Sequence, residues 1–119
     1  MLKVQINNLN ENNISIEIEV PAERCKSSYQ SALNRLGRSV RLPGFRLGKV
    51  PKQVIIQQVG IAKIKASALE ELIENAWKES IKQESIEPIT EAQLKEELQS
   101  LVDRFNPEKS VSFTLEVQI

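Results

Sequence analysis

Apolar residues at every second position mark both ends of the chain as strands. They alternate with polar residues over positions 2–6 and 14–20, on either side of an Asn-rich segment at 7–13. A period of two is typical of a half-buried strand, and two such runs around a polar turn predict a β-hairpin. Residues 111–119 repeat the alternation and predict a further strand.

Between these strands, apolar residues recur every three or four positions, which predicts helices. One helix follows Pro21 over residues 22–40, and a short one follows Pro51 over 52–58 and ends at Gly60. Proline suits a helix start and glycine a helix end. A long helix is predicted over 61–84, with Ile61 and Trp77 on its buried face.

The segment after Pro88 keeps helical spacing less clearly. Thr90 and Gln93 have the spacing of a capping box, so a fourth helix is predicted over residues 91–105, with a strand before it left open. The segregation of strands and helices predicts an α+β fold, an antiparallel sheet with helices packed on one face. The 119 residues fit one domain. Because residue 119 closes an apolar strand, residues 1–119 are interpreted as a single domain excised from a longer chain.

Charge divides the chain into two unequal parts. Ten basic residues and no acidic residue lie between Arg24 and Lys65, whereas the remainder holds six basic and sixteen acidic residues. A formal net charge of zero therefore conceals a segment of +10 and a remainder of −10. A strongly basic surface predicts an anionic partner, of which nucleic acid is the commonest.

The residue inventory offers little for catalysis. The chain has no histidine, which excludes histidine-dependent nucleophilic catalysis and imidazole zinc sites. The lone Cys25 lies on an apolar helix stripe and is predicted to be buried, and a single cysteine favours a reducing compartment. No apolar run approaches the roughly 20 residues of a membrane span. These features predict a cytoplasmic, non-enzymatic domain with no cofactor, no metal and no membrane partner.

The segment over residues 41–51 joins two prolines and two glycines around a phenylalanine, an arginine and a leucine. It fails as a phosphate-binding loop, since three residues separate its glycines and Val50 stands where Ser or Thr is needed. A ring beside a guanidinium on a rigid loop is what a protein-binding hot spot requires. The alternative is that Phe45 and Leu47 fold back into the core and only Arg46 is solvated.

Five residues of this segment, Gly44, Phe45, Arg46, Gly48 and Pro51, match the pattern Gly-Phe-Arg-x-Gly-x-x-Pro. The segment resembles the signature loop of the trigger factor family, the bacterial ribosome-associated chaperones. The resemblance is to the family's N-terminal, ribosome-binding domain and covers essentially the whole chain. It implies docking on the large ribosomal subunit, beside the tunnel exit, through a tunnel-exit protein and ribosomal RNA. It also implies unfolded nascent polypeptides as partners, and a separate prolyl isomerase domain elsewhere in the parent protein.

By this resemblance the ribosome-binding residues are in one loop, with Phe45 as apolar anchor and Arg46 as ion-pairing contact. Leu47 replaces the lysine usual in the family, which removes one charge and leaves an apolar or weaker contact there. The full set of expected ribosome-binding residues is Gly44, Phe45, Arg46, Leu47, Gly48, Lys49 and Pro51. The candidate RNA contacts are Arg38, Arg41 and Lys52.

Two further interpretations stay open. A sequence-tolerant RNA-binding module could use the surface between Arg24 and Lys65 alone. An isolated domain with apolar surface meant for a neighbour is also a candidate for homodimer formation.

Overall fold

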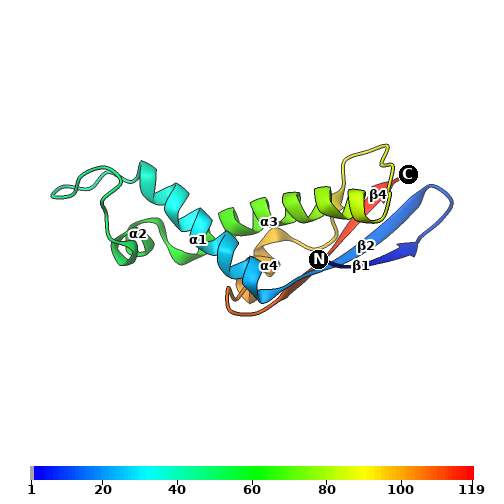
Figure 1. The fold of residues 1–119 in the computed structure, drawn as a ribbon, viewed down its shortest axis with the longest axis horizontal. Coiled ribbons are helices and arrows are strands. Elements are labelled where there is room, and N and C mark those ends of the chain that lie inside the picture. The colour runs from blue at the N-terminus through cyan, green and yellow to red at the C-terminus, as the bar shows by residue number, and fades with distance from the viewer. Residues whose placement is uncertain (1) are drawn as a thin grey trace.

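Two strands far apart in the sequence form the centre of the sheet (Figure 1). In this computed structural model, which describes residues 2–119, β2 (Asn13–Val20) pairs antiparallel with β4 (Val111–Gln118). β1 (Lys3–Asn8) pairs with β2, and the short β3 (Gln93–Leu94) pairs with β4, both antiparallel. The strand order is β1-β2-β4-β3. The predicted hairpin, the last strand and the antiparallel sheet are confirmed.

Alternation along β2 and β4 builds the core on one face of the sheet. Ile16 lies opposite Leu115 and Ile18 lies opposite Phe113, and all four side chains are buried. α3 (Ile61–Gln83) runs along this face (Figure 1). The other face carries polar pairs such as Glu17 opposite Thr114. The predicted α+β arrangement, with helices on one face of the sheet, is confirmed.

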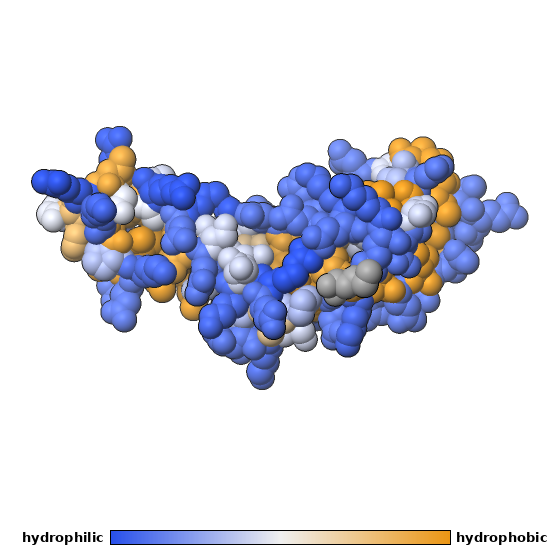
Figure 2. Space-filling view, in the orientation of Figure 1, coloured by the Kyte–Doolittle hydropathy of each residue, from blue (hydrophilic) through white to orange (hydrophobic). Residues whose placement is uncertain are grey.

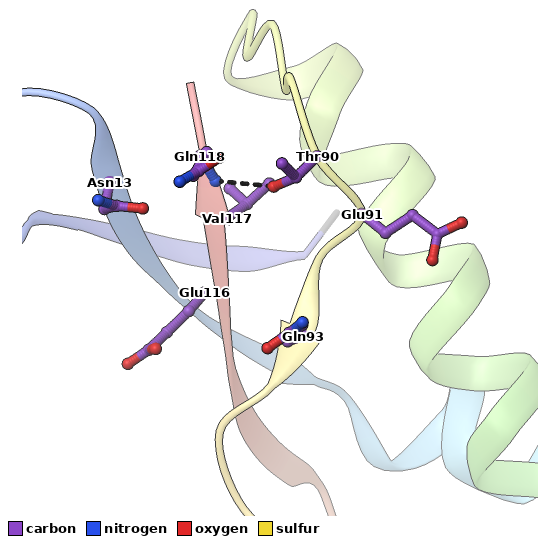
Figure 3. Close-up of a pocket in the computed structure, with 7 residues that line it drawn as sticks. All are labelled: Asn13, Thr90, Glu91, Gln93, Glu116, Val117 and Gln118. Carbon is purple, nitrogen blue, oxygen red and sulfur yellow. Dashed lines mark hydrogen bonds between the residues drawn. The ribbon is translucent and has the colours of Figure 1, made fainter.

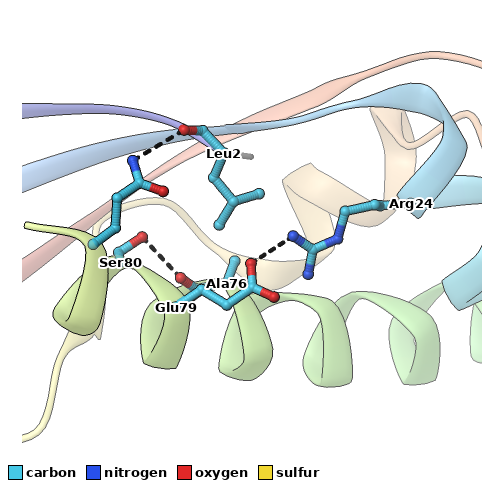
Figure 4. A network of polar contacts seen from close by, with 6 residues as sticks. Leu2, Arg24, Ala76, Glu79 and Ser80 are labelled. Carbon is cyan, nitrogen blue, oxygen red and sulfur yellow. Dashed lines mark hydrogen bonds and ion pairs between the residues drawn. The ribbon is translucent and has the colours of Figure 1, made fainter.

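α1 (Ala22–Ser39) packs against α3, and polar contacts fix the two helices to each other. Arg24 Nη1 lies 2.6 Å from Glu79 Oε2, as Figure 4 shows. Farther along α1, Arg35 forms an ion pair with Glu71. Because one contact lies near each end of α1, the direction in which that helix leaves the sheet is set by α3.

The molecule is elongated because α1 extends beyond the sheet. Its principal extents are 59 × 25 × 24 Å and its radius of gyration is 16.6 Å, against about 13–14 Å for a compact domain of this length. A loop and α2 (Lys52–Val59) complete the end away from the sheet (Figure 1). Gly37 lets α2 pack closely on α1, since a Cβ built there would lie 2.6 Å from Ile55 Cδ1.

The helix predicted over residues 91–105 is wrong in its first half. β3 occupies part of that segment, and α4 (Leu98–Arg104) begins seven residues later than predicted. The Lys95 N–H donates to the Thr114 carbonyl at 2.9 Å, and the Thr90 hydroxyl accepts from the Gln118 N–H at 3.2 Å instead of capping a helix. Residues 93–94 pair with β4 instead of forming a helix, because the outer edge of β4 would otherwise expose unpaired backbone groups.

Two side chains placed on the buried face of the long helix differ from the prediction. Ile61 is 53% exposed, because the first turn of α3 lies beyond the sheet. Trp77 is half-buried: it packs against the core and also lines a surface cavity. Cys25 is buried as predicted, and burial raises the pKa of its thiol. Over residues 2–119, no helix combines the length and the apolar character that crossing a membrane requires.

Candidate functional site

Two consecutive tight turns build the loop between α1 and α2. The Phe45 N–H donates to the Leu42 carbonyl at 3.2 Å, and the Lys49 N–H donates to the Arg46 carbonyl at 2.9 Å. The third residue of each turn is a glycine, with φ of 86° at Gly44 and 81° at Gly48. A type II turn requires this left-handed geometry at its third position, which glycine adopts at no steric cost. The glycines therefore fix the backbone that presents residues 45–47.

The loop holds Phe45 and Leu47 outside the core. Their exposed fractions are 44% and 54%, whereas Val50 is buried and Leu42 is half-buried at the base of the loop. The interpretation in which Phe45 and Leu47 fold back into the core is therefore wrong. Figure 2 shows apolar side chains among charged ones at this end of the molecule. An exposed ring and an exposed leucine on either side of Arg46 form a small apolar surface with one cation at its centre.

The basic segment is not uniform, because α3 neutralises part of it. Arg24 and Arg35 form ion pairs with Glu79 and Glu71. Five exposed cations nearer the loop form no ion pair with any residue of the described range 2–119. These five, called the tip cations below, are Arg38, Arg41, Arg46, Lys49 and Lys52. Within the described range, eight cations of the basic segment thus form no ion pair: the five tip cations around the loop, and Lys26, Lys63 and Lys65 outside it.

The predicted site residues lie together at one end of the molecule. Gly44 to Lys49 lie within the two turns, and Pro51 is the N-cap residue directly before α2. Arg38 lies in the last turn of α1 and Lys52 in the first turn of α2, so they flank the loop with Arg41. The loop is therefore a projection whose tip is both apolar and cationic.

The larger cavities lie elsewhere, and sequence reasoning missed them. One of about 630 Å³ is lined by polar residues at the edge of the sheet, among them Thr90, Gln93 and Glu116 (Figure 3). Another of about 510 Å³ lies between α3 and β3, where Trp77 and Leu98 line it. The helix predicted over 91–105 would have placed these residues differently, which is why no sequence signal indicated either cavity. Within residues 2–119, no three Cys, Asp or Glu side chains form a group suited to a metal ion.

Gly48→Ala is expected to lower the affinity of the loop for any partner that binds it. The domain itself should stay folded. No atom lies within 4 Å of the added Cβ, so the penalty comes only from the left-handed backbone, about 1–2 kcal/mol or roughly 5–30-fold in affinity. Gly60→Ala is the matched control, with φ of 94° and equally open surroundings at a helix junction outside the loop. Titration calorimetry or sedimentation measures the difference, and equal losses in both variants would contradict the role of the turn.

Comparison with known proteins gives a single family. The family model described as bacterial trigger factor protein matches residues 2–119. The chain is 50% identical over 118 residues to trigger factor of Prochlorococcus marinus, and 47% identical over 118 residues to trigger factor of Parasynechococcus marenigrum. Each alignment covers 99% of this chain and 25% of the relative, so the chain spans about a quarter of their length.

A solved structure shares the fold. It comes from work on promiscuous substrate recognition in folding and assembly activities of the trigger factor chaperone. The TM-score is 0.74 at 22% sequence identity, over 97% of this chain and 26% of the other.

Proposed function

This chain belongs to the bacterial trigger factor family, and on that premise we propose that it docks a nascent-chain chaperone on the large ribosomal subunit. Docking beside the tunnel exit would keep the chaperone where new polypeptides emerge in the cytoplasm. The observation that carries the proposal is the loop itself, which exposes Phe45 and Leu47 around Arg46 on a backbone fixed by two turns.

In this proposal the loop binds a protein at the tunnel exit. Phe45 inserts as the apolar anchor, since buried aromatic side chains supply much of the energy of compact interfaces. Arg46 pairs with a carboxylate of the partner, because its planar guanidinium can form two parallel hydrogen bonds with one carboxylate. Leu47 packs beside Phe45, and its exposure favours an apolar contact at that position. Gly44, Gly48 and Pro51 act by holding the loop in shape.

The other four tip cations would face ribosomal RNA. Arg38, Arg41, Lys49 and Lys52 surround the loop and have no carboxylate partner within residues 2–119. Arg and Lys side chains bind the phosphate groups of RNA, and each phosphate that they neutralise releases counterions. Protein and RNA contacts would then act together, the first giving specificity and the second attracting the domain to the ribosome.

The remaining activities would belong to other parts of the parent protein. The chain aligns with about a quarter of its relatives, so a substrate cradle and a prolyl isomerase centre would lie in the other three-quarters. Residues 1–119 would then form a single non-enzymatic docking domain, and unfolded nascent polypeptides would be partners of the whole chaperone.

Co-sedimentation tests this function. The chain is expected to pellet with isolated large ribosomal subunits and to stay in the supernatant with small subunits. Naked ribosomal RNA is the competitor that separates the two interpretations. If it displaces the chain completely, the sequence-tolerant RNA-binding module is correct and the docking proposal is wrong. Partial displacement at most is expected for a site that also requires a protein.

Homodimer formation would use the end of the molecule opposite the loop. Four exposed apolar side chains occur near the sheet and the chain ends, namely Ile6, Leu9, Ile89 and Ile119. Figure 2 shows apolar surface at this end as well. Light scattering at high protein concentration measures the mass, and a monomer throughout would rule out this association.

A further inference from the structure

One face of α1 carries neutral polar side chains that the docking loop does not explain. Ser27, Gln30, Ser31 and Asn34 are all exposed and recur every three or four residues, so they lie on one side of the helix. They line a shallow groove of about 380 Å³ together with Arg35 and Arg38. We call these four residues and Arg38 the α1 stripe. It leads along the helix towards the loop.

The hydrogen-bonding groups of the stripe are free to meet a partner. Within residues 2–119, the side chains of Ser27, Gln30, Ser31 and Asn34 make no hydrogen bond. Arg35, by contrast, is directed to α3, where it contacts Glu71 and Ser67. The stripe therefore offers several neutral donors and acceptors and one unpaired guanidinium.

The charge around the stripe favours an anionic occupant. The last carboxylate before it is Glu23, in the first turn of α1, and no other acidic residue occurs before Glu70. A helix face exposed to solvent usually carries charges of both signs. Such a face is well solvated but attracts neither anionic nor cationic partners strongly. Glu71 of α3 reaches the groove at Arg35 and is paired with that guanidinium, and the α1 stripe itself carries no carboxylate. A face of Ser, Gln, Asn and Arg38 is therefore complementary to phosphate.

We propose that the α1 stripe lies along the sugar–phosphate backbone of ribosomal RNA when the loop is docked. The proposal rests on the proposed function and extends its contact surface from the loop to the side of α1. Ser, Asn and Gln side chains supply many of the hydrogen bonds that proteins make to phosphates and sugars. Hydroxyl and amide groups also suit the 2′-hydroxyl displayed by RNA. Arg38 contributes the charge.

The composition of the stripe argues against a protein in the same place. The buried centre of a protein–protein interface is apolar and aromatic, and serine is depleted there. The stripe exposes no aliphatic or aromatic side chain, whereas the loop exposes two within three residues. From Ser27 to Arg38 the stripe is about 17 Å long at 1.5 Å per residue, enough to follow several nucleotides of one strand. The loop and the stripe therefore fit different classes of partner.

Ser31→Glu tests the proposal by placing a carboxylate in the middle of the stripe. It is expected to weaken binding to large subunits by at least about tenfold, because like charges at an interface repel. Ser100→Glu is the matched control, the same exchange at an exposed position of α4 on another part of the molecule. Equal affinity of the two variants, with docking still dependent on Phe45, would overturn this proposal and leave the docking function standing. Failure of the unaltered chain to bind large subunits would overturn both.

A second measurement identifies the occupant. Cys25 is buried, so Ser31→Cys introduces an exposed thiol to which an iron chelate can be attached. Hydroxyl radicals from the chelate are expected to cut ribosomal RNA at a confined position in the docked complex, and the same probe at Ser100→Cys is expected to cut elsewhere or not at all. Cleavage of a ribosomal protein with the RNA left intact would overturn the assignment to RNA.

Discussion

Replacing Phe45 and Arg46 together by alanine is expected to lower the affinity for large ribosomal subunits by about a hundredfold or more. Each side chain has the character of an interface hot spot, for which truncation to alanine removes about 2 kcal/mol or more. The losses need not add, since both side chains would occupy the same site on the partner. Sedimentation with a titration of subunits gives the affinity directly. A double variant that pellets as the unaltered chain does would refute docking through this loop.

The fold of that double variant should be unchanged. Phe45 and Arg46 are exposed, and the turns that contain them are closed by backbone hydrogen bonds. Circular dichroism and thermal unfolding are expected to match those of the unaltered chain within about 0.5 kcal/mol. Ile89→Ala with Lys109→Ala is the matched control, since it removes an exposed apolar residue and an exposed cation far from the loop in the sequence. This control should bind normally.

Ribosome binding should fall about 50- to 150-fold when the salt concentration rises from 50 to 200 mM. Four tip cations are assigned to RNA, and each neutralised phosphate contributes a slope of about −0.7 to −0.9 in a plot of log affinity against log salt. The expected slope is therefore about −3, and Arg38, the one charged residue of the α1 stripe, is already among the four cations counted. A slope near zero would show that these cations meet no RNA.

Single neutralisations identify which cations contribute to that slope. Lys52→Gln is expected to make it shallower by about 0.7–0.9, because one phosphate contact is lost. Arg24→Gln with Glu79→Gln removes an ion pair in which Arg24 already has a partner, so the slope should stay the same. If both variants changed the slope equally, the attraction would come from the whole basic segment rather than from the tip.

Residues 41–51 alone were enough to predict the resemblance to the trigger factor family and a loop built on tight turns. Glycines at the third position of each turn and a proline at the second position of the first are local requirements of backbone geometry, so they are visible without the fold. The exposure of the Phe45 side chain could not be predicted from the sequence. A phenylalanine in a loop is buried or displayed according to which neighbours surround it, and those neighbours come from α1 and α2 together.

The distribution of free charge also depended on tertiary contacts. The sequence predicted ten cations in one basic segment, but the antiparallel packing of α1 on α3 brings Glu79 to Arg24 and Glu71 to Arg35. Each ion pair joins residues more than thirty positions apart in the chain. No local pattern could have shown that the positive charge near the sheet is partly neutralised and that around the loop is not.

By itself the sequence determined the elements whose periodicity is long and regular, namely the hairpin, the last strand and the helices α1, α2 and α3. It also determined the chemistry that the loop carries. Tertiary structure alone decided residues 91–97, where the open edge of β4 recruited a strand in place of a predicted helix. It also decided that Phe45, Leu47 and the tip cations meet at one end of an elongated molecule. Periodicity depends on the backbone of a single segment, whereas edge pairing, exposure and ion pairing depend on what other segments bring alongside it.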